Sequence, residues 1–592
     1  ALREAYEAFG KAHGDMADSF GLDYLRKIDD PFYPALAALT VNGKPSDILT
    51  KSTIRGARGI ENPTPQDAYV LARNKSVEPS LSEIAALAGK PEAEVRAALV
   101  KSGAVFEAPN GDVVPSDIYL SGNVRQKLRE AQAALDDGNQ AMTRNVAELK
   151  KVIPEDVPYF NIESQLGATW VPAKAYAEYV AHMLNRQNAD GIEATFLNGR
   201  WKIRLPDGAN HSTAAQTGFG TKQYPFSKLV NAAFTNQTVK IRRKDSDGNE
   251  YVDTEATDEA NARIGDIRTK FGEWLWSDPE RRAALEAEYN ESRNSYATPK
   301  FDGSFLHMDG MALSLGRGPF NLRQHQVNAI WRALVNRRSL NAHEVGTGKT
   351  FTMGGIAVES RRYGIAKKPV ILAHNANSAS VSAEIQMMYP AAKVLYIDNL
   401  DKNSIAVRMR QIANDDWDAI VMPHSLIDRL SFREETLMEM AREDIRALEE
   451  EAYAAAEEDG VKLDAKIMDD EEELKKVRSV TAKELVKARN RIIETIKKQA
   501  MQSSREGSIP FEDLGIDMVL VDEVHEFKKP PISTRMNMKG LNTQTSNRSI
   551  ALQFITRYIR ANNFGGNVHT FTGTPITNTL TEIFHQMRYV ME

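Results

Sequence analysis

Short apolar runs alternate with helical patterns through the second half of the chain. The runs are rich in Val, Ile and Leu and are too short for helices, and apolar positions at helical spacing separate them. This alternation predicts a parallel, doubly wound sheet with helices on both faces, so the expected fold class is α/β. The predicted strands are 368–373, 393–397, 418–422, 517–521 and 568–571.

A long helical pattern interrupts these strands at 434–501. It has two apolar stripes, which include Leu437, Ile445 and Leu448 and then Leu485, Ile492 and Ile496. Gly460 lies between the stripes, so an antiparallel helical hairpin inserted into the lobe is expected. The first arm is acidic and the second basic. The arms can therefore pair with each other, and binding of a partner is the alternative.

The first half of the chain has a different pattern, and we divide it into three regions. Residues 1–78 are expected to be helical. Residues 79–170 predict a winged-helix-like region followed by a helical pair: Gly89 and Pro91 separate two short helices, and Asn110-Gly111 makes a hairpin turn. A helix of this kind can dock on DNA, but Glu92 and Glu94 beside Arg96 make a purely structural role equally open.

Residues 171–300 predict an α+β accessory domain with two β-hairpins. One spans 195–204 and includes Asn198-Gly199; the other pairs 238–243 with 250–254 around Asp247-Gly248-Asn249. Basic side chains on these strands form a candidate phosphate-facing strip, although solvated strand edges carry Lys and Arg as well. They are Lys202, Arg204, Lys240, Arg242 and Arg243. Residues 301–592 then form the α/β lobe.

The sequence from Ala342 to Thr350 predicts a phosphate-binding loop that opens a helix. Gly346 and Gly348 let backbone N–H groups approach an anion, and Lys349 places one positive charge among the phosphates. Thr350 offers a hydroxyl to Mg²⁺. The general pattern has glycine where His343 stands. The expected nucleotide-binding residues are Gln326, Arg323, Glu344, Val345, Gly346, Thr347, Gly348, Lys349 and Thr350.

Three further clusters complete the candidate site. Gln326 carries the donor and acceptor needed to read adenine, and Phe320 can stack on the base. Asp522-Glu523-Val524-His525 follows a buried strand, where a carboxylate pair suits Mg²⁺ binding and water orientation. Thr572-Gly573-Thr574-Pro575 follows another strand. The expected catalytic residues are Lys349, Asp522, Glu523 and His525, and the expected metal ligands are Thr350 and Asp522.

This ordered set of motifs resembles the first RecA-like lobe of superfamily-two helicases, and most closely the Swi/Snf-type translocases. It is closer still to large phage and conjugative-element proteins that join a helicase to an adenine-specific DNA methyltransferase, phage defence-against-restriction proteins among them. The matching text includes His343–Thr350, Asp522-Glu523-x-His525-x-Phe527-Lys528 and Thr572-Gly573-Thr574-Pro575-Ile576-x-Asn578. The segments 119–128 and 166–172 also look like this group.

The resemblance implies where nucleic acid is held and how the nucleotide is coupled to it. The implied DNA-contacting residues are His374, Asn375, His424, Ser425, Thr572, Gly573 and Thr574. His525, with Thr572 and Thr574, would link the nucleotide to that side. The segment after 373 departs from the family pattern, which has a Pro-Asn pair there and a Gln-Trp pair later.

Composition limits the alternatives. The 592 residues suit roughly three to five domains, and the 42% apolar and 26% charged residues are typical of a globular protein. There is no cysteine, signal peptide or membrane-spanning run, so a bacterial cytoplasm is the expected location, in a phage or mobile-element setting. The net charge of −6 offers no overall attraction to nucleic acid, so any DNA binding depends on local basic strips.

The sequence therefore predicts an ATP-dependent DNA translocase that uses ATP and Mg²⁺ and favours duplex DNA over RNA. The chain starts at Ala1 and stops soon after Pro575. We expect it to be a fragment that binds ATP but hydrolyses it poorly, with a second RecA-like lobe and a methyltransferase domain elsewhere in the full protein. The alternatives are an RNA helicase, a nucleotide-gated scaffold for the methyltransferase, and a DNA-binding module with a decayed ATP site.

Overall fold

The computed structural model describes residues 2–51, 60–197, 199–221, 223–244, 250–315, 318–398, 402–503, 509–527, 546–577 and 581–591. The chain divides into two compact units. The first comprises residues 1–106, 113–116 and 301–592, and the second comprises 107–112 and 117–300. Several residues that were singled out in the sequence lie outside the described part, namely Asn198, Asp247, Gly248, Asn249, Lys528 and Asn578.

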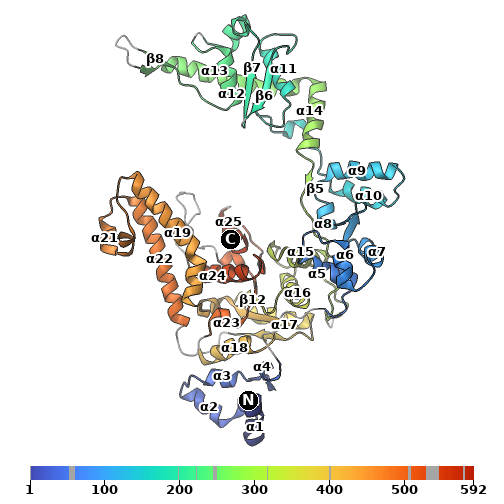
Figure 1. The fold of residues 1–592 in the computed structure, drawn as a ribbon, viewed down its shortest axis with the longest axis vertical. Helices are drawn as coiled ribbons and strands as arrows, with labels where there is room; N and C mark the ends of the chain where they lie inside the picture. Colours follow the sequence, from blue (N-terminus) through green and yellow to red (C-terminus); the bar gives the residue numbers. More distant parts are fainter. Residues whose placement is uncertain are drawn as a thin grey trace. The chain divides into compact units, whose positions relative to one another are not determined.

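A six-stranded parallel sheet forms the centre of the first unit (Figure 1). Its order is β11-β16-β15-β12-β14-β13, and every described pairing is parallel. This sheet fits a RecA-like α/β lobe. The strands are β11 (Arg338–Ala342), β12 (Pro369–Ala373), β13 (Val394–Tyr396), β14 (Ala419–Pro423), β15 (Met518–Val521) and β16 (Val568–Thr572).

Alternate residues of the central strands enter two separate hydrophobic cores. In β12, Val370 and Leu372 belong to one cluster, and Ile371 and Ala373 belong to the other. Strands β14 and β15 divide in the same way, because successive side chains of a strand point to opposite faces. Both faces are therefore covered, which explains why the strands read as continuous apolar runs rather than as alternating ones.

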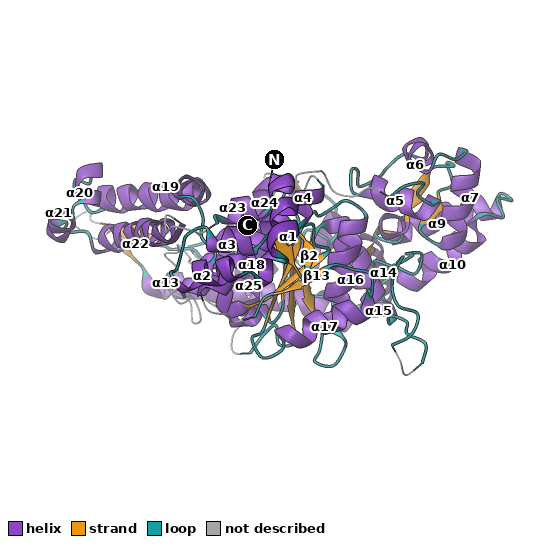
Figure 2. Cartoon of the chain, turned by 90° about the horizontal axis from the view of Figure 1, so that it is seen from below, coloured by secondary structure: helices purple, strands orange, loops and turns teal. Residues whose placement is uncertain are grey.

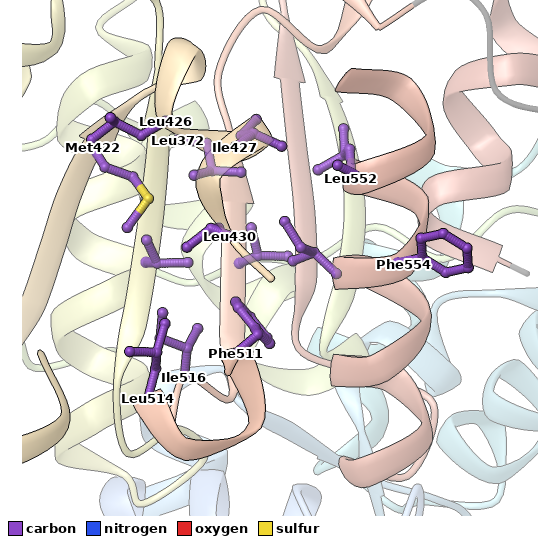
Figure 3. Close-up of a cluster of buried hydrophobic side chains, with 14 of the residues drawn as sticks. Leu372, Met422, Leu426, Ile427, Leu430, Phe511, Leu514, Ile516, Leu552 and Phe554 are labelled. Carbon is purple, nitrogen blue, oxygen red and sulfur yellow. The ribbon is translucent and has the colours of Figure 1, made fainter. Parts of the chain in front are cut away.

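Helices cover both faces of the sheet (Figure 2). Figure 3 shows part of one core, where Leu372 and Met422 from the strands lie beside Leu426 and Ile427 of a short connecting segment, and Leu552 comes from a helix on the other side. The helices of that face are α18 (Lys402–Asn414), α23 (Phe511–Leu514), α24 (Asn547–Asn562) and α25 (Thr581–Met591). The opposite face is covered by α15 (Gln324–Asn336), α16 (Lys349–Arg362) and α17 (Ser378–Met388).

Strand β11, directly before the phosphate loop, was not among the predicted apolar runs. Its sequence is polar, yet Ser339 and Asn341 are buried. The Asn341 amide donates to the Ser339 hydroxyl at 2.8 Å and to the Thr570 carbonyl at 3.3 Å, and that hydroxyl lies 3.0 Å from Nδ1 of His569. Burial lowers the pKa of His569 to about 3, which keeps the ring neutral between the strands. Polar pairing thus replaces apolar packing at this edge.

Two N-terminal segments pack on the lobe within the first unit. Residues 2–51 form α1 (Leu2–His13), α2 (Phe20–Lys27), α3 (Tyr33–Ala37), the β1–β2 hairpin (Thr40–Val41, Lys44–Pro45) and α4 (Asp47–Thr50). Asp415 of the lobe accepts hydrogen bonds from the Ser46 hydroxyl at 3.0 Å and from the Asp47 N–H at 2.9 Å. Lys393 pairs with Asp47 at 2.7 Å and lies 3.3 Å from the buried Asp415, so ionic contacts and hydrogen bonds anchor this segment.

The second segment contains the predicted winged-helix pattern. After α5 (Pro65–Arg73) come α6 (Leu81–Ala88), α7 (Glu92–Ser102), β3 (Val105–Glu107) and β4 (Val113–Pro115). A capping box between Ser80 and Glu83 starts α6, and Gly89 in the left-handed conformation ends it. The helices and the hairpin are therefore confirmed. Side chains of α5, α6 and α7 share a core with α15 and α16, while docking of α7 on DNA stays a prediction.

The insertion is a helical hairpin, as predicted. Its arms are α19 (Glu434–Glu458) and α22 (Val480–Ser503), joined through α20 (Ala465–Asp469) and α21 (Glu471–Lys476) (Figures 1 and 2). A separate core that includes Leu448, Leu474 and Val486 holds the arms together. Arg489 of α22 bridges to Glu449 of α19 at 2.8 Å, so the acidic and basic arms do pair with each other.

The second unit combines helices with short hairpins, and its core is built around α11 (Ala173–Met183), α12 (Phe226–Phe234) and α13 (Thr254–Ser277).

The described part of the chain contains no helix long and apolar enough to cross a membrane. The division between the units falls inside the predicted 79–170 region, and the predicted domain boundaries stay predictions. The other elements are α8 (Ser116–Tyr119), α9 (Val124–Asp136), α10 (Met142–Val152), α14 (Pro279–Ser292), β5 (Gly122–Asn123), β6 (Glu193–Leu197), β7 (Arg200–Arg204), β8 (Arg242–Lys244), β9 (Glu250–Val252) and β10 (Tyr296–Ala297).

Candidate functional site

The phosphate loop joins β11 to α16, whose first residue is Lys349. Gly346 and Gly348 have φ values of +85° and +83°, a region that side-chain-bearing residues rarely adopt. A β-carbon at Gly348 would overlap the amide nitrogen of Gln326, whereas one at Gly346 would meet nothing within 4 Å. The loop therefore needs glycine at both positions, and it presents the free N–H groups of the first turn of α16 to an anion.

The loop lysine meets the acidic motif directly. Nζ of Lys349 lies 3.3 Å from Oε1 of Glu523, and their side chains are only 11% and 24% exposed. The same ammonium lies 3.5 Å from the carbonyl oxygen of His343. The strand order accounts for this meeting, because β11, β16 and β15 are neighbours and their carboxyl ends share one edge of the sheet.

Asp522 is a buried carboxylate with one oxygen that is not hydrogen-bonded. It is 7% exposed, and its Oδ1 has no partner among the described residues. Burial, together with the charge of the neighbouring Glu523, raises the pKa of this carboxyl to about 6, and Lys349 opposes that shift. A buried, unpaired acceptor of this kind is costly unless a ligand satisfies it.

The residues present fit Mg²⁺ held jointly with a nucleotide. No group of three or more acidic, His or Cys side chains in the described ranges could hold a metal ion by itself. Mg²⁺ usually takes one or two protein carboxylates and completes its shell with phosphate oxygens and water. Asp522 supplies such a carboxylate, and Thr350 follows Lys349 in the first turn of α16.

Glu523 is held in a strained backbone conformation by its neighbours. Its φ and ψ are 45° and 49°, the left-handed region, which costs energy for a residue with a side chain. Its Oε2 lies 3.2 Å from Nδ1 of His525 and accepts a hydrogen bond from the Gly573 N–H at 3.4 Å. With Lys349 on its other oxygen, this carboxylate is fixed from three sides.

The loop after β16 closes the site. Nδ1 of His525 lies 2.9 Å from the Thr572 hydroxyl oxygen, which also accepts a hydrogen bond from the Thr574 N–H at 3.1 Å. A β-carbon on Gly573 would come within 2.9 Å of Cγ2 of Val345 and 3.1 Å of Nζ of Lys349. The phosphate loop, the acidic motif and the Thr-Gly-Thr-Pro loop are thus in mutual contact.

Gln326 holds the phosphate loop in place through hydrogen bonds to its backbone. It is 4% exposed, its Oε1 accepts from the Arg323 N–H at 2.8 Å, and its Nε2 donates to the carbonyls of Thr347 and Gly348 at 3.2 and 3.0 Å. Both ends of the amide are therefore satisfied by the protein. Phe320 packs against Phe351, with ring centroids 5.1 Å apart. Adenine recognition by Gln326 and stacking by Phe320 stay predictions.

The expected DNA-contacting residues that follow β12 and β14 also come together, around a residue that the sequence did not single out. Glu526 lies 3.3 Å from Nε2 of His374 and 3.1 Å from Nδ1 of His424, one oxygen to each ring. Oδ1 of Asn375 accepts from the Ser425 N–H at 3.1 Å. Burial lowers the pKa of His424, and Glu526 opposes that shift. Glu526 follows His525 directly, but no spacing rule pointed to it.

Comparison with known proteins adds two matches. Residues 331–592 match a family model described as a probable helicase domain, and residues 165–295 match one described as a domain of unknown function (DUF8437). No curated protein matches the chain. The first match starts inside α15 and contains the phosphate loop, the acidic motif and the Thr-Gly-Thr-Pro loop.

Proposed function

We propose that the helicase-like domain of this chain is the first motor lobe of an ATP-dependent DNA translocase of superfamily two. One observation carries the proposal. The Lys349 ammonium lies 3.3 Å from Glu523, next to a buried Asp522 oxygen that is not hydrogen-bonded, at the shared carboxyl edge of three neighbouring strands. Phosphoryl transfer requires three groups in one place: a positive charge that binds the phosphates, a carboxylate that binds the metal, and a carboxylate that orients the attacking water.

Each residue then has a role that follows from its position. The N–H groups at the start of α16 and Lys349 bind the phosphates, while Asp522 and Thr350 hold Mg²⁺. Bound Mg²⁺ would neutralise charge that develops on the phosphate oxygens. Glu523, fixed by Lys349, His525 and Gly573, orients the attacking water. His525 also contacts Thr572, so a change at the nucleotide reaches the Thr-Gly-Thr-Pro loop.

The proposal of duplex DNA as the substrate rests on the resemblance of the sequence motifs. The text around Asp522-Glu523-x-His525 and Thr572-Gly573-Thr574-Pro575 is Swi/Snf-like, which supports duplex DNA over RNA. The likeness of 119–128 and 166–172 to large phage and mobile-element proteins supports a linked methyltransferase and a role in DNA modification or anti-restriction. A second RecA-like lobe in the same full-length protein completes the proposal, because an arginine finger contributes about 10³–10⁵ in rate to such motors.

The test is Glu523→Gln, which keeps the shape of the side chain and removes its charge. Single-turnover hydrolysis with excess protein should fall by roughly 10²-fold or more. Nucleotide affinity should be kept or improved, since Lys349 loses its internal partner. Glu384→Gln, on α17 with an exposed hydrogen bond to Ser380, is the matched control and should change neither quantity. Unchanged hydrolysis in Glu523→Gln would refute the assignment.

Nucleic-acid stimulation separates the alternatives. Duplex DNA should accelerate hydrolysis by the full-length protein more than RNA of the same length does, and the reverse order would favour an RNA helicase. If Glu523→Gln stopped hydrolysis but left the biological activity of the full-length protein intact, the domain would be a nucleotide-gated scaffold.

A further inference from the structure

Charge is divided unevenly within the domain of unknown function at 165–295. Residues 186–244 carry ten Lys and Arg against three Asp and Glu, whereas residues 245–295 carry six against fourteen. The domain therefore has a basic half and an acidic half, in a chain whose net charge is −6. A polyanion that gains nothing from the chain as a whole can still bind where positive charge is concentrated.

The basic half presents a row of cations on one face of the β6–β7 hairpin. Arg200, Lys202 and Arg204 of β7 are exposed, and they alternate with Trp201 and Ile203, which are buried in the core of the second unit. The three basic side chains therefore point away from that core. Alternate side chains of a strand repeat about every 6.6 Å, which is close to the separation of successive phosphates along a nucleic-acid strand.

The charge of this row is mostly uncompensated. The residues of β6 that oppose it on the same face are Leu197, Thr195 and Glu193. One carboxylate thus faces three cations, and it lies 3.7 Å from Arg204, whose side chain is still 78% exposed. Arg200 and Lys202 form no ion pair with any residue that the structure describes. Two of the three cations are therefore available to an anion from solution.

Protection of an open strand edge does not account for the row. Charged side chains often guard such an edge against pairing with another strand. Here Asn231 of α12 already occupies the edge of β7: its Oδ1 accepts from the Ile203 N–H at 2.8 Å, and its Nδ2 donates to the Ile203 carbonyl at 3.0 Å. An acidic peptide that added to β7 as a further strand would need these same groups. The row therefore suits an anion that binds through side chains alone.

We propose that Arg200, Lys202 and Arg204 bind successive phosphates of a nucleic-acid strand, which gives the domain at 165–295 a nucleic-acid-binding role. The two guanidinium groups can each hold a phosphate through paired N–H donors, and the ammonium of Lys202 adds a point charge between them. Contacts of this kind carry no base sequence information. The row belongs to the second unit, and binding there needs neither ATP nor Mg²⁺.

Acetylation of lysines in the whole chain, without nucleotide, locates the contact. The rate at Lys202, read by mass spectrometry, should fall several-fold when nucleic acid is bound. Lys174 of α11 is the matched control: it belongs to the same domain and is 86% exposed, but it lies 3.8 Å from Glu178, and its rate should not change. Duplex DNA, single-stranded DNA and single-stranded RNA of equal length show which form binds. Failure of all three to protect Lys202, or equal protection of Lys174, overturns the proposal.

The salt dependence of binding counts the phosphate contacts. Each contact contributes about 0.7 to the slope of log affinity against log salt for a single strand, and about 0.9 for a duplex. Alanine at Arg200, Lys202 and Arg204 together should lower that slope by about 2–3, so the loss of affinity should be roughly 20- to 40-fold larger at 50 mM than at 200 mM salt. Lysine at both arginine positions should keep the slope, and so should Lys174→Ala. An unchanged slope in the triple alanine variant contradicts the contacts.

Other polyanions test whether the row selects nucleic acid. Polyglutamate and phosphatidylserine vesicles, each at the same concentration of negative charge, should protect Lys202 much less than the oligonucleotide does. Equal or better protection by either of them would assign the row to an acidic protein or a membrane surface and overturn the proposal. Glu523→Gln should leave the protection of Lys202 by nucleic acid unchanged, so failure of the motor assignment and failure of this strip are separable.

Discussion

Replacement of Gly348 by alanine tests the construction of the phosphate loop. The φ of +83° imposes a left-handed conformation on the new side chain, at a cost of about 1–2 kcal/mol. The β-carbon would also displace Gln326, whose amide donates to Gly348 and Thr347 at 3.0 and 3.2 Å. Two lost hydrogen bonds add about 2 kcal/mol. The total of about 3–4 kcal/mol predicts a roughly 100- to 1,000-fold loss of nucleotide affinity.

Gly346→Ala is the matched control. Its φ is +85°, but no atom lies within 4 Å of the new β-carbon, so only the backbone cost remains. The expected loss is roughly 5- to 30-fold. Affinity is measured with a fluorescent ATP analogue and Mg²⁺, together with thermal unfolding to confirm that each variant is folded.

A double variant identifies the source of the difference. Gln326→Ala alone should lose about 30-fold through its hydrogen bonds. Combined with Gly348→Ala it should add little further loss, because the side chain that the β-carbon displaces is then already gone. Fully additive losses, or a Gly346→Ala effect as large as that of Gly348→Ala, would refute this reasoning.

The remaining predictions concern the metal site, the lobe packing and the N-terminal segment. Because the pKa of Asp522 is raised to about 6, its charged form disappears as pH falls through that value; Mg²⁺-dependent nucleotide affinity should fall with it, while Asp522→Asn should show a weak, pH-independent affinity. Gly303→Ala should lower the free energy of unfolding by about 1–3 kcal/mol, since its β-carbon would lie 2.5 Å from the Val327 carbonyl oxygen; chemical denaturation of the lobe measures this. Asp415→Ala removes the acceptor for Ser46 and Asp47 and should make residues 2–51 sensitive to limited proteolysis, whereas an unchanged digestion pattern would show that the segment is held by other contacts.

The sequence predicted those strands whose burial is apolar. β12, β14 and β15 are covered on both faces, so their sequences are continuous apolar runs, and the structure places strands there within a residue or two of the predicted bounds. β11 was missed because its interior contacts are hydrogen bonds among Ser339, Asn341 and Thr570, which leave no hydrophobic periodicity to detect. The winged-helix elements could be predicted because Gly89 marks the end of a helix and Asn110-Gly111 marks a hairpin turn, and both can be recognised from neighbouring residues alone.

Site residues could be predicted where they belong to a local sequence motif. They could not be predicted where only the tertiary fold brings them to the site. Lys349 and Glu523 were found because each follows a strand in a recognisable motif. The contacts of Gln326 with the loop depend on how α15 packs beside α16, and the two histidine contacts of Glu526 depend on which strands are neighbours. The sequence states neither arrangement. The same holds in the second unit, where Gly167 packs closely against the carbonyl oxygen of Phe234.

Iron-mediated cleavage tests the central claim most directly. Fe²⁺ replaces Mg²⁺ in the nucleotide complex, and the hydroxyl radicals that it generates with peroxide cut the backbone nearest the metal. The account predicts three clusters of cuts that all require nucleotide, near Gly348–Thr350, Asp522–Glu523 and Thr572–Thr574, and that are all lost in Asp522→Asn. Cuts at only one of these clusters, or cuts elsewhere in the chain, would contradict a single metal–triphosphate site at this edge of the sheet.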